Sequence, residues 1–202
     1  MIKAKSFINI ASDYGFNTYS GVPCSFLTPL INEVISDDRL EYIPASNEGD
    51  AIAIASGVWL GNKRGIAMMQ NSGLGNAINP LISIAHKKVY SIPMVLIIGW
   101  RGEILKNNKQ INDEPQHIAQ GKNTISFLKN LNIDYKIISS KTKNIENVLK
   151  TIFLKSLKMN KPCALVVRKD TFQKTLLKKI KKKKYNITRE KVIEKVISSI
   201  PK

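Results

Sequence analysis

Short apolar runs of strand type alternate with segments of helical periodicity along most of the chain, and this alternation restricts the fold more than any other feature. Strands are expected at residues 16–25, 40–46, 64–71, 92–100, 135–139 and 162–169. Helices are expected at residues 3–14, 26–37, 48–61, 73–88, 125–132 and 144–159. Such alternation predicts an α/β fold, in which helices cover both faces of a mostly parallel sheet.

The length and apolar content fit a chain with one main domain. With 202 residues, of which 43% are hydrophobic, the chain can bury a substantial core. The longest apolar run, residues 92–100, is well short of the roughly 20 residues that a membrane helix needs. The first 16 residues lack the pattern of a signal peptide. We therefore expect a cytoplasmic protein that does not enter a membrane.

The two cysteines and the positive charge point to no special chemistry. Cys24 and Cys163 lie far apart in apolar segments, so we expect buried thiols rather than a disulfide or a metal site. Lysine and arginine total 32 against 15 acidic residues, but much of this excess falls in residues 174–186. A run of like charges is usually solvated, and in the rest of the chain aromatic residues are not interleaved with the basic ones. We therefore expect a linker there and no nucleic-acid binding.

Polar and glycine-rich segments follow the first four expected strands. They are GVPCS at 21–25, ASNEGD at 45–50, QNSGLGN at 70–76 and GWRGE at 99–103. Ligands of open α/β sheets bind outside the carboxyl ends of the strands. The four segments are therefore predicted to face one crevice that holds the ligand.

Two carboxylates stand at the start of the apolar helix expected at residues 48–61. Asp50 is explained by the favourable interaction of an acidic side chain with the first turn of a helix. Glu48 is expected to be partly desolvated beside so apolar a helix, which suits a group that exchanges a proton. The alternative for Glu48 is a buried helix cap. Gly73 and Gly75 can be read as ordinary turn glycines before a helix or as part of a phosphate-binding loop. A lone Gly-x-Gly is weak evidence for the second reading.

A family resemblance rests on five segments that occur in order: GVPCSFLTPLINEVISD, NEGDAIAIASGVWLG, QNSGLGNAINPL, WRGE and DEPQH. Together they resemble the amino-terminal half of phosphonopyruvate decarboxylase, a thiamine diphosphate enzyme, over roughly residues 5–200. QNSGLGN and RG are also similar to the alpha subunit of sulfopyruvate decarboxylase. The resemblance implies a three-layer, Rossmann-like parallel sheet that binds the aminopyrimidine ring of thiamine diphosphate.

The resemblance also implies roles for individual residues. Glu48 matches the glutamate that hydrogen-bonds the N1′ nitrogen of the aminopyrimidine and takes part in catalysis. His117 matches a loop histidine that relays protons, with a structural loop histidine as the alternative. Arg101 and Ser25 are polar groups at strand ends, and a substrate with a carboxylate and a phosphonate needs such donors. For Arg101 we expect a substrate or cofactor-pocket contact, with a surface salt bridge as the alternative. The residues expected to contact the cofactor, in part through backbone geometry alone, are Glu48, Pro23, Asn71, Ser72, Gly73 and Gly75.

One departure from the family pattern concerns the diphosphate. Relatives hold it through Mg²⁺ in a second domain marked by Gly-Asp-Gly and a later Asn-Asn, and no Gly-Asp-Gly occurs here. We therefore expect a pyrimidine-binding domain at residues 1–175, and at 176–202 a basic linker and helix leading toward a diphosphate-binding domain or subunit. Oligomerisation is expected from the resemblance alone.

The expected activity is decarboxylation of the 2-oxo acid 3-phosphonopyruvate to phosphonoacetaldehyde and CO₂. Two alternatives stay open: the alpha subunit of a sulfopyruvate decarboxylase, and a non-catalytic α/β binding module.

Overall fold

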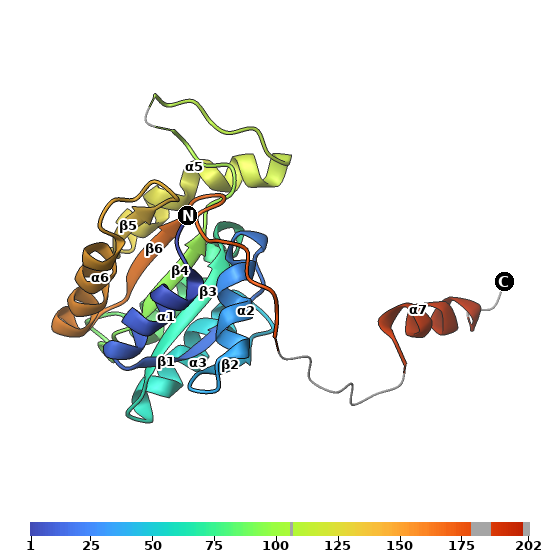
Figure 1. Ribbon diagram of the computed structural model, residues 1–202, viewed down its shortest axis with the longest axis horizontal. Coiled ribbons are helices and arrows are strands. Elements are labelled where there is room, and N and C mark those ends of the chain that lie inside the picture. The colour runs from blue at the N-terminus through green and yellow to red at the C-terminus, as the bar shows by residue number, and fades with distance from the viewer. Residues whose placement is uncertain (106, 179–186, 200–202) are drawn as a thin grey trace.

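A six-stranded parallel sheet forms the centre of the protein (Figure 1). The computed structural model describes residues 1–105, 107–178 and 187–199. The strand order is β2-β1-β3-β4-β6-β5, and every neighbouring pair runs in parallel. The strands are β1 (Phe16–Gly21), β2 (Glu41–Pro44), β3 (Arg64–Gln70), β4 (Val95–Gly99), β5 (Asp134–Ile138) and β6 (Cys163–Val167). The predicted parallel α/β fold is thereby confirmed.

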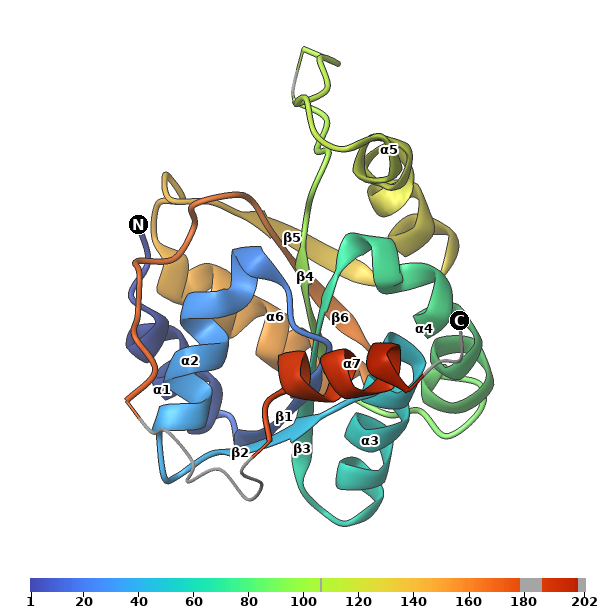
Figure 2. The same cartoon turned by 90° about the vertical axis from the view of Figure 1, so that its right-hand side faces the viewer.

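Helices cover both faces of this sheet and complete three layers (Figure 2). One face carries α1 (Ala4–Asp13), α2 (Thr28–Ser36) and α6 (Ile145–Met159). The other face carries α3 (Glu48–Leu60), α4 (Leu74–Pro80) and α5 (Pro115–Asn130). A further helix, α7 (Arg189–Ser198), has no buried residue. None of the helices in the described ranges is long and apolar enough to cross a membrane.

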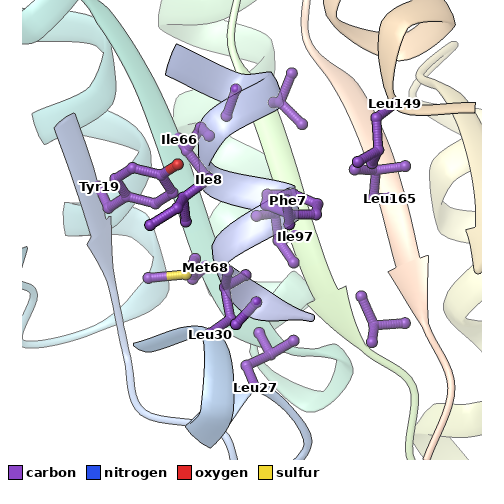
Figure 3. Packing of buried hydrophobic residues seen from close by; sticks show 14 of the residues in the cluster. Phe7, Ile8, Tyr19, Leu27, Leu30, Ile66, Met68, Ile97, Leu149 and Leu165 are labelled. Atoms are coloured by element: carbon purple, nitrogen blue, oxygen red, sulfur yellow. The ribbon is translucent and has the colours of Figure 1, made fainter. Parts of the chain in front are cut away.

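The core consists of two apolar clusters, one on each side of the sheet. Successive strand residues point to opposite faces, so one strand supplies both clusters. On β4, for example, Val95 and Ile97 belong to the α1/α2/α6 side, whereas Leu96 and Ile98 belong to the α3/α4/α5 side. Figure 3 shows the first cluster, to which α1 contributes Phe7 and β4 contributes Ile97. Strands that are apolar on both faces explain why the sequence reads as short continuous apolar runs.

The elements agree with the sequence prediction in type and order, but the first strand ends at Gly21 instead of residue 25, and two helices differ. The helix expected at residues 73–88 is α4 followed by a π-helical turn, Leu81–Ala85, that begins directly after Pro80. The helix expected at 125–132 begins earlier, at Pro115, whose fixed backbone angle suits the first helical position. His117 therefore lies in the first turn of α5, and the prediction that it lies in a loop is wrong.

The segment after β6 crosses α2 before it leaves the described part of the chain. Asn32 of α2 donates its side-chain amide to the carbonyl of Thr175, and the backbone N–H of Lys178 donates to Ser36 Oγ. The start of the expected linker is thus attached to the domain although its lysines are exposed. Most of the lysine run, residues 179–186, lies outside the described residues.

Candidate functional site

The carboxyl ends of β1, β2, β3 and β4 lie side by side because these four strands are neighbours in the sheet. The segments that follow them, residues 21–25, 45–50, 70–76 and 99–103, form what we call the strand-end rim. The four segments thus lie at one edge of the sheet, as predicted, and the single ligand crevice stays a prediction. A hollow of about 350 Å³ at the opposite edge, bordered by Pro162 and Ile133, contains none of the predicted site residues.

Glu48 is the first residue of α3, and the side chain that caps this helix belongs to Asn47. The Asn47 side chain accepts a hydrogen bond from the backbone N–H of Asp50 at 3.1 Å, and its amide donates to the Asp50 carboxylate at 2.9 Å. This cap satisfies the first turn of the helix. The Glu48 side chain is therefore not needed as the cap. Glu48 is half-buried, which fits the prediction of a partly desolvated carboxyl group.

The carboxyl group of Glu48 lies between two residues of the QNSGLGN segment. Its Oε2 accepts a hydrogen bond from Asn76 Nδ2 at 2.8 Å. It also lies directly over Gly73, where a Cβ atom would come 2.1 Å from Glu48 Cδ and 2.2 Å from Oε1. Only glycine permits this approach. Among the described residues, Oε1 has no hydrogen-bond partner, so one carboxyl oxygen is held and the other is free for a ligand.

A second polar group on the rim joins β3 to α5. Gln70 Nε2 donates to Ser72 Oγ at 2.6 Å and lies 3.5 Å from Nδ1 of His117. His117 is 8% exposed, and its backbone carbonyl packs where a side chain on Gly102 would lie. Ser72 and His117, two of the predicted residues, thus both contact the side chain of Gln70.

Asn71 points into the protein. Its Nδ2 donates to the Arg101 carbonyl at 3.0 Å and to Thr124 Oγ1 at 2.9 Å, while its Oδ1 accepts from the Arg101 N–H at 3.1 Å. The side chain is 1% exposed, and these bonds use all but one of the amide's hydrogen-bonding positions. Asn71 therefore connects the ends of β3 and β4 to α5 and shapes the rim through backbone geometry.

Arg101, directly after β4, is engaged by a carboxylate twelve residues later in the sequence. Its Nε donates to Asp113 Oδ2 at 3.0 Å, and a second guanidinium nitrogen donates to Oδ1, so the pair is bidentate. This hydrogen bonding with Arg101 lowers the pKa of Asp113 to about 2. The guanidinium also lies 5.8 Å from the centre of the Phe26 ring. The ion-pair alternative is thus present in the structure, and a substrate role of Arg101 stays a prediction.

The remaining predicted residues lie on the open side of the rim. Pro23, Ser25 and Gly75 are exposed, and a Cβ atom on Gly75 would meet no atom within 4 Å. Cys24, between Pro23 and Ser25, is buried against Gly99, and this burial raises the pKa of its thiol. Cys163 is buried too, so both cysteines are buried free thiols as predicted. A cavity of about 110 Å³ lies beside Arg101.

Sequence reasoning missed three side chains of this site: Asn76, Gln70 and Asp113. Each lies in or beside a segment singled out above, but none carries a charge pattern or spacing that indicates its contact. In the described ranges, no group of three or more His, Cys, Asp or Glu side chains could hold a metal ion.

The rim therefore has two differently built halves. The α3–α4 half consists of Glu48, Gly73, Gly75 and Asn76 and offers a free carboxyl oxygen above an approachable backbone. The β4–α5 half consists of Asn71 and Arg101, together with Asp113 and His117 that lie beside the rim. Asn71 and Asp113 both bind Arg101, and His117 contacts Gln70. A flat heterocycle with a basic ring nitrogen fits the first half, because Oε1 of Glu48, packed close to the backbone of Gly73, can bond that nitrogen.

These features define a class, the α/β domains that bind a heterocyclic cofactor at the carboxyl ends of parallel strands. Residues 2–122 match the family described as "Thiamine pyrophosphate enzyme, N-terminal TPP binding domain". The chain belongs to this family. Thiamine pyrophosphate is another name for thiamine diphosphate.

Its relatives include two phosphonopyruvate decarboxylases. The one from Streptomyces viridochromogenes is 43% identical over 142 residues, which are 70% of this chain and 34% of the relative. The one from Streptomyces hygroscopicus is 47% identical over 124 residues, 61% of this chain and 29% of the relative. Sulfopyruvate decarboxylase subunit alpha from Methanococcus maripaludis is 34% identical over 123 residues, 61% of this chain and 69% of that subunit. The chain thus spans about a third of the length of the two phosphonopyruvate decarboxylases.

Proposed function

We propose that this chain is the pyrimidine-binding half of a thiamine diphosphate-dependent decarboxylase that converts 3-phosphonopyruvate to phosphonoacetaldehyde and CO₂. The observation that carries the proposal is the Glu48 carboxyl group, held over Gly73 with Oε1 free. The names of the two Streptomyces relatives support the substrate.

In this proposal Glu48 binds the aminopyrimidine ring. Thiamine diphosphate, when bound, supplies the carbon nucleophile and the electron sink that 2-oxo acid decarboxylation requires. Glu48 Oε1 hydrogen-bonds the N1′ nitrogen of the ring and exchanges a proton with it. Gly73 allows the Glu48 carboxyl group to pack against its backbone, and Ser72, Gly75 and Pro23 border the ring in this proposal.

His117, Ser25 and Arg101 serve the substrate. His117 exchanges a proton near the reacting carbon, and its contact with Gln70 orients the imidazole. Ser25 is an exposed hydroxyl donor at the end of β1, and the charged edge of Arg101 that Asp113 leaves open faces an anionic group. A substrate with both a carboxylate and a phosphonate needs such donors at two places.

The diphosphate end of the cofactor and its Mg²⁺ belong to a second half, either a further domain or a separate subunit. Mg²⁺ prefers oxygen ligands, including carboxylates and the phosphate oxygens of its ligand. The described residues of this chain offer no such cluster of acidic side chains. We infer that the active site forms between this chain and that partner in an oligomer. Two buried thiols support a reducing compartment, the cytoplasm.

Decarboxylation of sulfopyruvate is the second candidate. The similarity to a sulfopyruvate decarboxylase subunit alpha favours it, because there the match covers 69% of a separate subunit. Phosphonate and sulfonate groups both require cationic and hydrogen-bonding partners, so the rim fits either. A non-catalytic binding module is the third candidate, and the free carboxyl oxygen of Glu48 argues against it.

The test has two parts. Calorimetry of the purified chain with thiamine diphosphate and Mg²⁺ should give weak or no binding, and the chain should release no aldehyde from phosphonopyruvate. With a diphosphate-binding half added, cofactor binding and aldehyde release should appear together, faster with phosphonopyruvate than with sulfopyruvate. Micromolar affinity or turnover by the chain alone would contradict the half-enzyme proposal. The reverse substrate preference would establish the second candidate.

A further inference from the structure

We propose that Asn76 is a positioning residue for Glu48, fixing which carboxyl oxygen carries the proton that this group exchanges. The effect of Asn76 on catalysis depends on the proposed function, whereas its effect on the Glu48 side chain does not. It starts from one contact, the 2.8 Å hydrogen bond from Asn76 Nδ2 to Glu48 Oε2.

The contact joins the starts of two helices. Glu48 is the first residue of α3 and Asn76 is the third residue of α4, and both helices pack on the same face of the sheet. Each follows a different strand of the rim. The hydrogen bond therefore sets the Glu48 side chain relative to the QNSGLGN segment, from which Gly73 also approaches it.

The chemistry of an amide determines what the contact does. The nitrogen of an asparagine side chain is only a donor, so the oxygen it contacts must accept. Because the unprotonated oxygen of a carboxyl group is the stronger acceptor, this contact favours Oε2 as the oxygen without a proton. When the carboxyl group is protonated, the proton is on Oε1, which lies over Gly73 and has no other partner among the described residues. Asn76 thus directs the proton toward the face that the cofactor ring would occupy.

The fold near Asn76 is held by backbone packing rather than by its side chain. A Cβ atom on Gly49 would lie 2.9 Å from the Asn76 carbonyl oxygen, so the first turns of α3 and α4 are in close contact. The hydrogen bond itself is exposed, and exposed polar pairs contribute little to stability. Substitution of the Asn76 side chain should therefore release Glu48 without unfolding either helix.

The matched control is Asn79, three residues further along α4. It is exposed like Asn76, and its Oδ1 accepts a hydrogen bond from Ser83 Oγ at 2.9 Å. It does not contact Glu48. Asn79→Ala therefore removes a similar amide from the same helix without touching the proposed site.

The first measurement uses the chain as it is and involves no cofactor. Three-bond NMR couplings of Glu48 report whether its side chain holds one rotamer. They should indicate one rotamer in the native chain and in Asn79→Ala, but rotamer averaging in Asn76→Ala and Asn76→Asp, which both remove the donor. Unchanged Glu48 couplings in both Asn76 variants would overturn the proposal, whatever the enzyme does.

The second measurement uses the enzyme assembled with its diphosphate-binding half. Loss of a hydrogen bond to a charged group corresponds to roughly a 10- to 100-fold effect, so kcat should fall by about that factor in Asn76→Ala. KM for the 2-oxo acid should change little, because Asn76 does not contact the substrate in this proposal. If the kcat of Asn76→Ala equals that of Asn79→Ala, Asn76 does not influence catalysis through Glu48. If the couplings change but the native enzyme decarboxylates no 2-oxo acid, the proposed function fails and the positioning role stands.

Discussion

The two halves of the strand-end rim use similar residues in opposite ways. In the β4–α5 half, Arg101 and Asp113 form a bidentate pair, and the Asn71 amide is almost fully bonded to the backbone and Thr124. In the α3–α4 half, Glu48 has a single hydrogen-bond partner for its two carboxyl oxygens among the described residues. Polar groups that satisfy one another hold a structure, whereas a group with spare hydrogen-bonding capacity can bind a ligand.

The same contrast appears between two carboxylates near the rim, the half-buried Asp113 and the buried Glu103. Asp113 has hydrogen-bond donors on both oxygens, which lowers its pKa. Glu103 is 6% exposed and lies 3.2 Å from Arg168 without a hydrogen bond from it, so burial raises the Glu103 pKa. Alignment of a partner, and not only its distance, decides whether a buried acid is stabilised in its charged form.

The largest effect is expected for Glu48→Gln in the assembled enzyme. The amide cannot exchange a proton, so decarboxylation should fall by about 10²- to 10⁴-fold. Asp50→Asn removes a negative charge two residues away and serves as the control, with a rate close to native. A Glu48→Gln enzyme with near-native kcat would mean that the free oxygen is not catalytic.

The second prediction concerns the backbone approach at Gly73. Gly73→Ala places a Cβ atom 2.1 Å from Glu48 Cδ, so the carboxyl group must move. Overpacking of this kind costs about 1–3 kcal/mol, and we expect cofactor affinity to weaken correspondingly, measured by calorimetry on the assembled enzyme. Gly57→Ala on α3, where nothing lies within 4 Å, is the matched control and should bind normally. Equal affinity of the two variants would remove Gly73 from the site.

The third prediction tests whether the β4–α5 half is structural. Asn71→Ala leaves buried backbone groups of Arg101 without partners, which should lower the free energy of unfolding by about 1–3 kcal/mol. Urea denaturation of the chain measures this. The exposed Asn123 on α5 provides the comparison, and Asn123→Ala should cost far less. An Asn71→Ala chain as stable as Asn123→Ala would contradict a structural role.

The smallest effect is expected for Asp113→Asn. Because the Asp113 pKa is lowered to about 2 in the folded protein, its ion pair stabilises the fold above the unfolded-state pKa of about 4. This contribution, about 1 kcal/mol or less, is lost as the pH falls from about 4 toward 2. Acid denaturation of Asp113→Asn should therefore show a shallower loss of stability in that range.

Asp37 provides a comparison for this loss of stability at acid pH. Its pKa is also lowered to about 2, mainly by hydrogen bonding with Arg39, and the pair lies away from the rim. Asp37→Asn should also make the loss of stability at acid pH shallower, but it should leave the NMR signals of the rim unchanged. If Asp113→Asn leaves the rim signals unchanged as well, the pair does not shape the site.

The sequence predicted the sheet well because its strands are apolar on both faces and stand out as continuous runs, as residues 92–100 do. It also predicted the position of Glu48, since a carboxylate beside an apolar helix is conspicuous. The start of α5 was missed because its first residues are polar and show no apolar periodicity. The contacts of Asp113 and Asn76 depend on loop paths and helix positions, and no local spacing reports these.

The central claim is that the α3–α4 half of the rim, and not the β4–α5 half, receives the aminopyrimidine ring. NMR titration of the isotope-labelled chain with thiamine, which carries this ring without the diphosphate, tests it most directly. We expect chemical-shift changes at Glu48, Gly73 and Asn76, which weaken in Glu48→Gln. Changes confined to Arg101, Asp113 and their neighbours, or none at saturating thiamine, would contradict the claim.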